Sequence, residues 1–135
     1  MSDDNIAFVR GRYEAFNKGD VEAVLGSFDE NIDWYEAEGM PQGGHYHGPQ
    51  AIADNVFGPI VNDIDGFQVT PDEFYADGDE VLVIATYSGT ARESGKDLRQ
   101  QAVHAWTVRD GKIARFRQFM DTVKYNEVLG VEASV

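Results

Sequence analysis

The chain has no cysteine among its 135 residues. Disulfides, thiolate nucleophiles and cysteine-ligated zinc or iron–sulfur sites are therefore excluded. Two phosphate-binding glycine loops, G-x-x-x-x-G-K-[ST] and G-x-G-x-x-G, are also missing. So is the G-x-S-x-G turn that exposes a serine nucleophile. The sequence thus gives no indication of nucleotide chemistry or of a cysteine or serine nucleophile.

Long hydrophobic runs are absent as well. No apolar stretch approaches the roughly 18 residues that a membrane-spanning helix requires. The N-terminal stretch MSDDNIAFVR is acidic and then helical in pattern, unlike a secretory signal peptide. We therefore expect a cytoplasmic protein without a membrane-spanning segment.

Basic residues are scarce: 11 Lys and Arg stand against 24 Asp and Glu, and the formal net charge is −13. A field of this sign repels phosphate backbones and anionic lipids. Neither nucleic acid nor a membrane surface is therefore an expected partner. The plainest role of the charge is solubility.

The length predicts one domain, residues 1–135, large enough to bury a core around a cavity. Helices are predicted at three places in the first 60 residues. The first helix carries an apolar stripe of Ile6, Val9, Tyr13 and Phe16. Asp20 is placed to cap the second helix, and Gly48-Pro49 opens the third. The inner side of the third helix would carry Ile52, Asn55, Val56 and Pro59.

Strands are predicted by alternation at residues 31–36, 67–76, 81–90, 98–108 and 113–120, with a short closing helix over 122–129. Asp110-Gly111 is a strong hairpin signal between the last two strands. If the hairpin pairs its strands one residue to one from this turn, Arg117 lies opposite His104. Helices followed by an antiparallel meander predict an α+β fold with the helices on one face of a sheet.

Four segments carry a family resemblance: YEAFNKGDVEAVLGSF, WYEAEGMPQGGHYHG, TPDEFYADGDEVLVIATYSGT and HAWTVRDGKIARFRQFMDT. They resemble SnoaL-like polyketide cyclases and ketosteroid isomerase-related proteins of the nuclear transport factor 2-like superfamily. The resemblance covers roughly residues 5 to 125. It implies a cone-shaped, strongly curved antiparallel sheet that encloses a pocket with three N-terminal helices. It also implies a homodimer through the outer sheet face, which would carry Val103, Ala105, Phe116 and Met120.

Three residues are candidates for acid/base catalysis. Glu36 shares a predicted strand face with Ile32 and Trp34, and burial there would make its carboxyl group a competent general base or acid. A glutamate at a strand end that reaches water fits the pattern equally well. By resemblance, His104 falls about where the isomerase keeps a protonated aspartic acid that donates to an oxyanion (one of the general examples of pKa tuning). Asp121 resembles the aspartate that acts as general acid/base in SnoaL-type cyclases. It is equally placed to cap the closing helix.

Other side chains are expected in the pocket. Tyr13 lies on the inner stripe of its helix, although alignment with the isomerase puts Arg12 at the place of the oxyanion tyrosine. Asn55 is expected to offer an amide hydrogen bond. The expected walls are Trp34, Phe57, Trp106 and Phe119, and core packing explains these residues equally well.

His45 and His47 form an H-x-H pair, which can begin a metal site. No carboxylate follows at short spacing, and the chain has three histidines in all. The expectation is that the pair lines the pocket mouth or faces solvent. We expect neither a metal nor another cofactor.

Two functions follow from the resemblance. The first is a cofactor-independent isomerase, cyclase or dehydratase acting on a small hydrophobic carbonyl compound. The second is a non-catalytic protein that binds a small molecule in the same fold. An epoxide hydrolase that uses Asp121 with Arg117 or Arg99 is a third and looser match.

Overall fold

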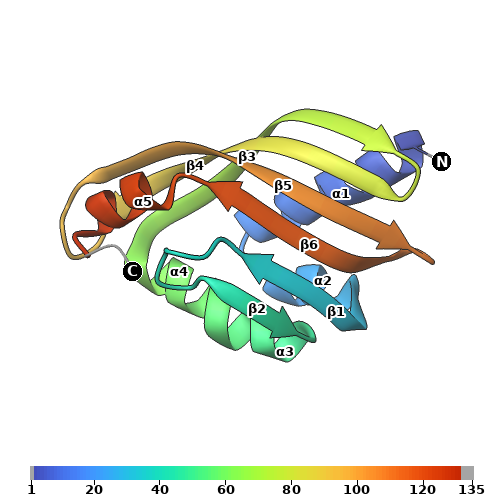
Figure 1. Cartoon of the computed structure of the whole chain (residues 1–135), viewed down its shortest axis with the longest axis horizontal. Coiled ribbons are helices and arrows are strands. Elements are labelled where there is room, and N and C mark those ends of the chain that lie inside the picture. Colours follow the sequence, from blue (N-terminus) through green and yellow to red (C-terminus); the bar gives the residue numbers. More distant parts are fainter. Residues whose placement is uncertain (1, 132–135) are drawn as a thin grey trace.

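Six strands form one curled, open sheet in the computed structural model of the chain, which describes residues 2–131 (Figure 1). The predicted domain of residues 1–135 thus begins and ends outside the described residues. The strands are β1 (Phe28–Glu36), β2 (Gly44–His47), β3 (Ile64–Asp77), β4 (Glu80–Ala91), β5 (Asp97–Arg109) and β6 (Lys112–Met120). Their order is β2-β1-β6-β5-β4-β3, and β1 and β6 are parallel while the other pairs are antiparallel. The predicted α+β class is confirmed, with one parallel pair in a sheet that we expected to be antiparallel.

The helices cover one face of the sheet and one end of it (Figure 1). They are α1 (Ser2–Asn17), α2 (Val21–Gly26), α3 (Pro49–Ile52), the π-helical turn η1 (Ala53–Phe57), α4 (Gly58–Asp63) and α5 (Thr122–Leu129). The predicted third helix corresponds to α3, η1 and α4, which follow one another without a break. Asp20 caps α2 as predicted, because its carboxylate accepts from the backbone N–H of Ala23 at 3.1 Å.

Alternation along the strands places the core on the inner, helix-covered face. In β4, Val81, Val83, Ala85 and Tyr87 are buried. In β5 the same holds for Ala102, His104 and Trp106, which were predicted to share a face. A sheet with one buried face needs this period of two, because successive side chains point to opposite sides. The inner face therefore collects the aromatic side chains of five different strands and of α1.

A β-bulge in β6 changes which of its side chains face inward. Val108 of β5 pairs with Ile113, but Thr107 pairs with Arg115, so Ala114 is an extra residue. An extra residue moves every later side chain to the opposite face from that given by even counting. His104 consequently lies opposite Gln118, and the predicted pairing with Arg117 is wrong.

The bulge also reverses two predicted phenylalanine positions. Phe116, expected on the outer face, is 3% exposed and lines the interior, whereas Phe119, expected in the pocket wall, is 54% exposed. Of the other residues expected on the outer face, Ala105 is buried and Met120 packs partly against the core. Val103 is exposed as predicted, and it is the register partner of Phe119 on one side and of Ile84 on the other.

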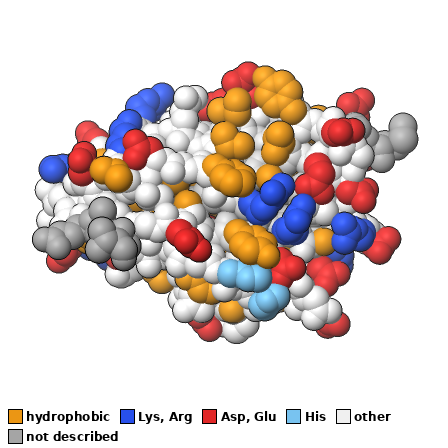
Figure 2. Space-filling model, in the orientation of Figure 1, with side chains coloured by type: hydrophobic (Ala, Val, Ile, Leu, Met, Phe, Trp, Pro, Cys, Tyr) orange, Lys and Arg blue, Asp and Glu red, His pale blue; other side chains and the backbone are white. Residues whose placement is uncertain are grey.

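Figure 2 shows the outer face, where orange hydrophobic side chains gather across the strands beside blue basic side chains and pale blue histidines. The large exposed hydrophobic residues of strands β1, β3, β4, β5 and β6 are Tyr35, Tyr75, Leu82, Val103 and Phe119. Within residues 2–131, no helix has the length and hydropathy needed to cross a membrane.

Candidate active site

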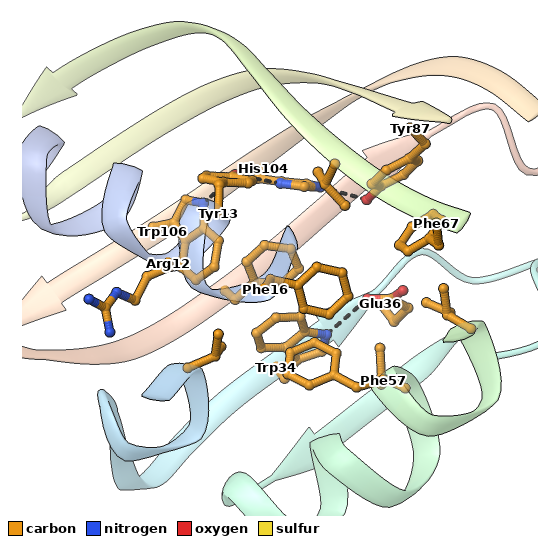
Figure 3. Close-up of a pocket in the computed structure, with 15 residues that line it drawn as sticks. Arg12, Tyr13, Phe16, Trp34, Glu36, Phe57, Phe67, Tyr87, His104 and Trp106 are labelled. Carbon is orange, nitrogen blue, oxygen red and sulfur yellow. Dashed lines mark hydrogen bonds between the residues drawn. The ribbon is translucent and has the colours of Figure 1, made fainter. Parts of the chain in front are cut away.

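A cavity lies between the inner face of the sheet and the helices, with a free volume of about 60 Å³ (Figure 3). Most of its wall is aromatic: Tyr13, Phe16, Trp34, Phe57, Phe67, Tyr87, Trp106 and Phe116 contribute to it. Trp34 and Phe116 stack with their ring centroids 3.8 Å apart. Polar groups are few among the lining residues, so the chemistry of the cavity depends mainly on Glu36, His104 and the tyrosine hydroxyls.

Glu36 is the last residue of β1, and its carboxyl group is buried in the cavity wall. Ile32, Trp34 and Glu36 all face inward, as the period of two predicts. The indole N–H of Trp34 donates to Glu36 Oε1 at 2.9 Å. Burial raises the pKa of Glu36 from 4.5 to about 7, although hydrogen bonds from Trp34 and Gln118 act in the opposite direction. Near neutral pH this carboxyl group can therefore both take up and release a proton.

His104 is buried opposite α1, with each ring nitrogen bonded to a tyrosine (Figure 3). Nδ1 lies 2.6 Å from the hydroxyl of Tyr13, and Nε2 lies 2.6 Å from the hydroxyl of Tyr87. Burial lowers the pKa of His104 to about 3, because the charged imidazolium would lose its water. The ring is therefore neutral at physiological pH and carries one N–H.

Both tyrosine hydroxyls also accept a hydrogen bond from a second neighbour. Trp106 Nε1 donates to Tyr13 at 2.8 Å, and Gln118 Nε2 donates to Tyr87 at 2.7 Å. The amide of Gln118 is oriented by the backbone N–H of Ala37, which donates to its Oε1 at 2.9 Å. A chain of hydrogen bonds thus runs from Trp106 through His104 to the end of β1.

This chain leaves one hydroxyl proton without an assigned acceptor. A neutral imidazole donates from one nitrogen and accepts at the other. If Nδ1 carries the proton, Tyr13 accepts from both Trp106 and His104, and its own O–H is free to donate elsewhere. If Nε2 carries the proton, Tyr87 is in that position instead. In either tautomer, one tyrosine can donate to an oxygen atom of a molecule in the cavity.

Residues 9–116 match the family of SnoaL-like domains. The chain belongs to this family. The predicted relationship is confirmed, and the fold is one shared with ketosteroid isomerase-like and polyketide cyclase-type structures.

Solved structures resemble this SnoaL-like protein over nearly its whole length. A nuclear transport factor 2-like protein from Burkholderia thailandensis has 31% identity and a TM-score of 0.88, covering 96% of this chain and 98% of the other. TerC, co-crystallized with polyporic acid, has 30% identity and a TM-score of 0.85, covering 93% and 98%. A protein with a ketosteroid isomerase-like fold from Catenulispora acidiphila, in complex with trimethylamine, has 16% identity and a TM-score of 0.80, covering 93% of each chain. No curated protein matches the chain.

Six of the side chains predicted for the site line the cavity of this SnoaL-like protein. They are Tyr13, Trp34, Glu36, Phe57, His104 and Trp106. Arg12 also lines it, but its guanidinium group donates to the backbone carbonyls of Phe8 and Ala23. Tyr13 is therefore the residue of α1 that joins the hydrogen-bond chain.

Five predicted site residues do not line the cavity: Phe119, the two surface histidines, and the exposed residues Asp121 and Asn55. Asp121 is exposed, and its carboxylate accepts from the backbone N–H of Lys124 at 3.1 Å, which makes it the N-cap of α5. Asn55 is exposed, and its amide donates to the carbonyl of Ala51 at 2.9 Å. The helix begins at Pro49, and the π-helical turn η1 widens its period, so position 55 falls on the solvent side while Val56 and Phe57 face inward.

His45 and His47 lie on the outer face of β2, away from the cavity. Together with Asp33 they form the one group of three potential metal ligands found among the described residues. Of the two expected positions, the pocket mouth and the solvent, the structure shows the second for both side chains. Glu36 and His104 belong to the interior and do not join them.

Sequence reasoning missed Tyr87 and Gln118. The sequence pattern could have identified Tyr87, because this residue continues the inward alternation of Val81, Val83 and Ala85. The pattern could not have identified Gln118. Regular alternation along β6 places this residue on the outer face, and only the bulge at Ala114 turns it inward.

Proposed function

We propose that the protein is a cofactor-independent acid/base enzyme acting on a small hydrophobic carbonyl compound. Glu36 takes a proton from the carbon next to the carbonyl group and later returns it to another atom of the same molecule. The free hydroxyl of Tyr13 or Tyr87 donates to the enolate oxygen that develops meanwhile. The observation that carries the proposal is a buried carboxyl group, with a pKa of about 7, in one cavity with a hydroxyl that has an uncommitted proton.

The two parts of this site do complementary work. A general base is most effective when its pKa lies near the working pH, which the burial of Glu36 achieves. A hydrogen-bond donor held in place before the reaction stabilises a developing oxyanion without reorganising. His104 contributes by orienting the tyrosines, since both of its nitrogens are occupied by their hydroxyls.

The cavity favours an uncharged, apolar and small substrate. Its wall is mainly aromatic, and Arg12 is engaged with backbone carbonyls. The free volume of about 60 Å³ is well below the ~300–1,000 Å³ typical of sites for drug-sized ligands. TerC was co-crystallized with polyporic acid, so binding of this acid by the present chain would test the expected preference for small, uncharged ligands.

Proton–deuterium exchange tests the proposal. Ketones and enones would be incubated with the protein in heavy water and followed by NMR, with wild type beside Glu36→Gln and the surface control Asp121→Asn. We expect Glu36→Gln to lose roughly 100-fold or more of the exchange rate. Asp121→Asn keeps both the helix cap and the rate. Equal exchange in wild type and Glu36→Gln would overturn the assignment of the base.

The tyrosines allow a second test of the same mechanism. Because either tautomer of His104 leaves one hydroxyl free, Tyr13→Phe and Tyr87→Phe should each retain part of the exchange activity. The double variant should lose far more than the two single losses combined. If the loss of exchange rate in the double variant equals the sum of the two single losses, the two tyrosines do not replace each other as donor to the enolate oxygen.

A non-catalytic binding protein is the second candidate function. It is favoured by the engagement of the polar wall, since His104, Tyr13 and Tyr87 each already bond to protein groups. Bound probe with exchange no faster than in buffer would establish this alternative. The looser epoxide hydrolase hypothesis has no support here, because Asp121 lies outside the cavity.

We also propose a homodimer through the outer sheet face. Ile84, Val103 and Phe119 are register partners across β4, β5 and β6, and Leu82 lies two residues from Ile84 on the same face. Val103→Glu should turn a dimer into a monomer in light scattering after gel filtration. A wild-type monomer would refute the proposal. The expectation of a cytoplasmic protein stays a prediction.

A further inference from the structure

A second group of ionisable side chains lies on the opposite face of β1 from Glu36. Asp33 and His47 are register partners in the β1–β2 ladder, and Tyr35 pairs with His45 two residues further along. All four point outward, because their neighbours Trp34 and Glu36 point inward. The backbone ladder of two antiparallel strands therefore holds one carboxylate and two imidazoles side by side.

The two imidazoles already meet at one oxygen of the Asp33 carboxylate. Asp33 Oδ1 lies 2.8 Å from His47 Nδ1 and 3.2 Å from His45 Nε2. One potential ligand atom from each of the three residues lies within 4.8 Å of the others. A zinc ion with ligands at about 2.0–2.2 Å needs ligand atoms roughly 3–3.5 Å apart. The two separations from Asp33, 2.8 and 3.2 Å, are close to this range, and the ligand atoms of all three residues lie within 4.8 Å of one another.

The surroundings support this arrangement. The ring of Tyr35 stacks on His45, with centroids 4.0 Å apart and an angle of 11° between the planes, which restricts the imidazole. Arg115 is the register partner of Asp33 on the other side, yet its guanidinium group pairs with Glu80 at 3.6 Å. The carboxylate of Asp33 is thus turned toward the histidines. The net charge of −13 also favours the approach of a cation.

We propose that Asp33, His45 and His47 form a binding site for a divalent transition metal ion. Two imidazoles and one carboxylate are a common protein ligand set for zinc, whereas calcium and magnesium prefer oxygen ligands alone. All three side chains are partly or largely exposed, at 38% for Asp33 and 69% for His47. The remaining coordination positions of the metal therefore face solvent and can take water or a donor from another molecule. This site is independent of the function proposed for the cavity.

The histidines themselves provide the first test. The chain contains three, and His104 is buried between two tyrosines, so it serves as an internal control. Untagged full-length protein would be titrated with zinc chloride at mildly alkaline pH, where imidazoles are available as ligands. Side-chain nitrogen NMR should show saturable shifts of His45 and His47 at one zinc per chain, with His104 unmoved. No shift of either surface histidine at millimolar zinc would overturn the proposal.

Variants of the cluster make the test specific. We expect His45→Gln, His47→Gln and Asp33→Asn each to weaken zinc binding by tenfold or more in calorimetry, on the order of what loss of a ligand or its support does at other metal sites. Glu30→Gln removes the same charge from the same strand outside the cluster and should leave the affinity unchanged. Binding that survives in the His45→Gln/His47→Gln double variant would show that the ion is held elsewhere.

Discussion

The two faces of β1 carry the same kinds of group and use them differently. Glu36 points inward, where its carboxyl group is buried beside Trp34. Asp33, three residues earlier, points outward and meets two histidines in contact with solvent. Inside, water is excluded and the protonation state itself is altered. Outside, water competes for every contact, so the contacts between Asp33 and the histidines contribute little free energy by themselves.

The environment of these groups, rather than the type of residue, therefore determines their chemistry. His104 and His47 have the same type of side chain, but burial keeps the ring of His104 neutral. Both ring nitrogens of His104 are hydrogen-bonded to tyrosine hydroxyls. A buried network of this kind has a fixed geometry, because an unpaired polar group in the interior is unfavourable.

Phe116 and Phe119 test the assignment of the two faces within one strand. Phe116→Ala removes a buried ring that stacks on Trp34, so it should lower the free energy of unfolding by about 3–5 kcal/mol. Phe119→Ala acts on an exposed ring and should change it by no more than about 0.5 kcal/mol. Urea unfolding at low protein concentration measures both. Equal losses would mean that the bulge at Ala114 does not turn the strand.

The pH dependence of stability tests the two buried titratable groups. Between about pH 4.5 and 7 the folded state holds a proton on Glu36 that the unfolded chain has released, so this group lowers stability as pH rises. Between about pH 3 and 6.5 the unfolded chain holds a proton on His104 that the folded state lacks, so this group raises stability with pH. From about pH 4.5 to 6.5 the two effects oppose each other.

Glu36→Gln removes one side of this balance. As pH increases from about 4.5 to 6.5, the free energy of unfolding of the variant should rise relative to that of wild type by about 1.4 kcal/mol per pH unit. Urea unfolding at three pH values within it measures the slope. Parallel curves for wild type and variant would show that the carboxyl group titrates alike in the folded and unfolded states.

Two tyrosines compare a buried hydroxyl with an exposed one. Tyr87→Phe leaves both His104 Nε2 and Gln118 Nε2 without their partner, so it should lower the free energy of unfolding by about 1–3 kcal/mol. Tyr75→Phe removes a hydroxyl that donates to Glu73 in solvent and should leave the unfolding midpoint unchanged. Chemical denaturation of the two variants side by side measures both free energies of unfolding. A similar midpoint for both would argue against a structural role for the buried chain of hydrogen bonds.

Asn55 should give the smallest effect. Asn55→Ala changes an exposed side chain that bonds only within its own helix, so stability should shift by no more than about 0.5 kcal/mol. Ligand binding should not change. Weaker binding of a probe in calorimetry would show that this amide reaches the cavity after all.

Local patterns were sufficient for the elements and for several of the site residues. The period of two identified the inward positions of Glu36 and His104, and the helical stripe identified Tyr13. They failed where geometry departs from the ideal period. The bulge at Ala114 reversed Phe116 and Phe119 and hid Gln118, and the π-helical turn moved Asn55 to the surface. Such irregularities are set by the packing of neighbouring elements, which a count along the chain does not contain.

By itself, the sequence determined what repeats locally: the order of helices and strands, the acidic charge, the absence of cysteine chemistry and the resemblance to SnoaL-like proteins. The tertiary structure alone decided which groups meet. Tyr13 and His104 are 91 residues apart in sequence, yet the Tyr13 hydroxyl lies 2.6 Å from Nδ1 of His104. Only burial decides that the carboxyl group of Glu36 titrates near neutrality. Strand register and desolvation both arise from contacts between distant segments, and for that reason these properties become visible only in the folded chain.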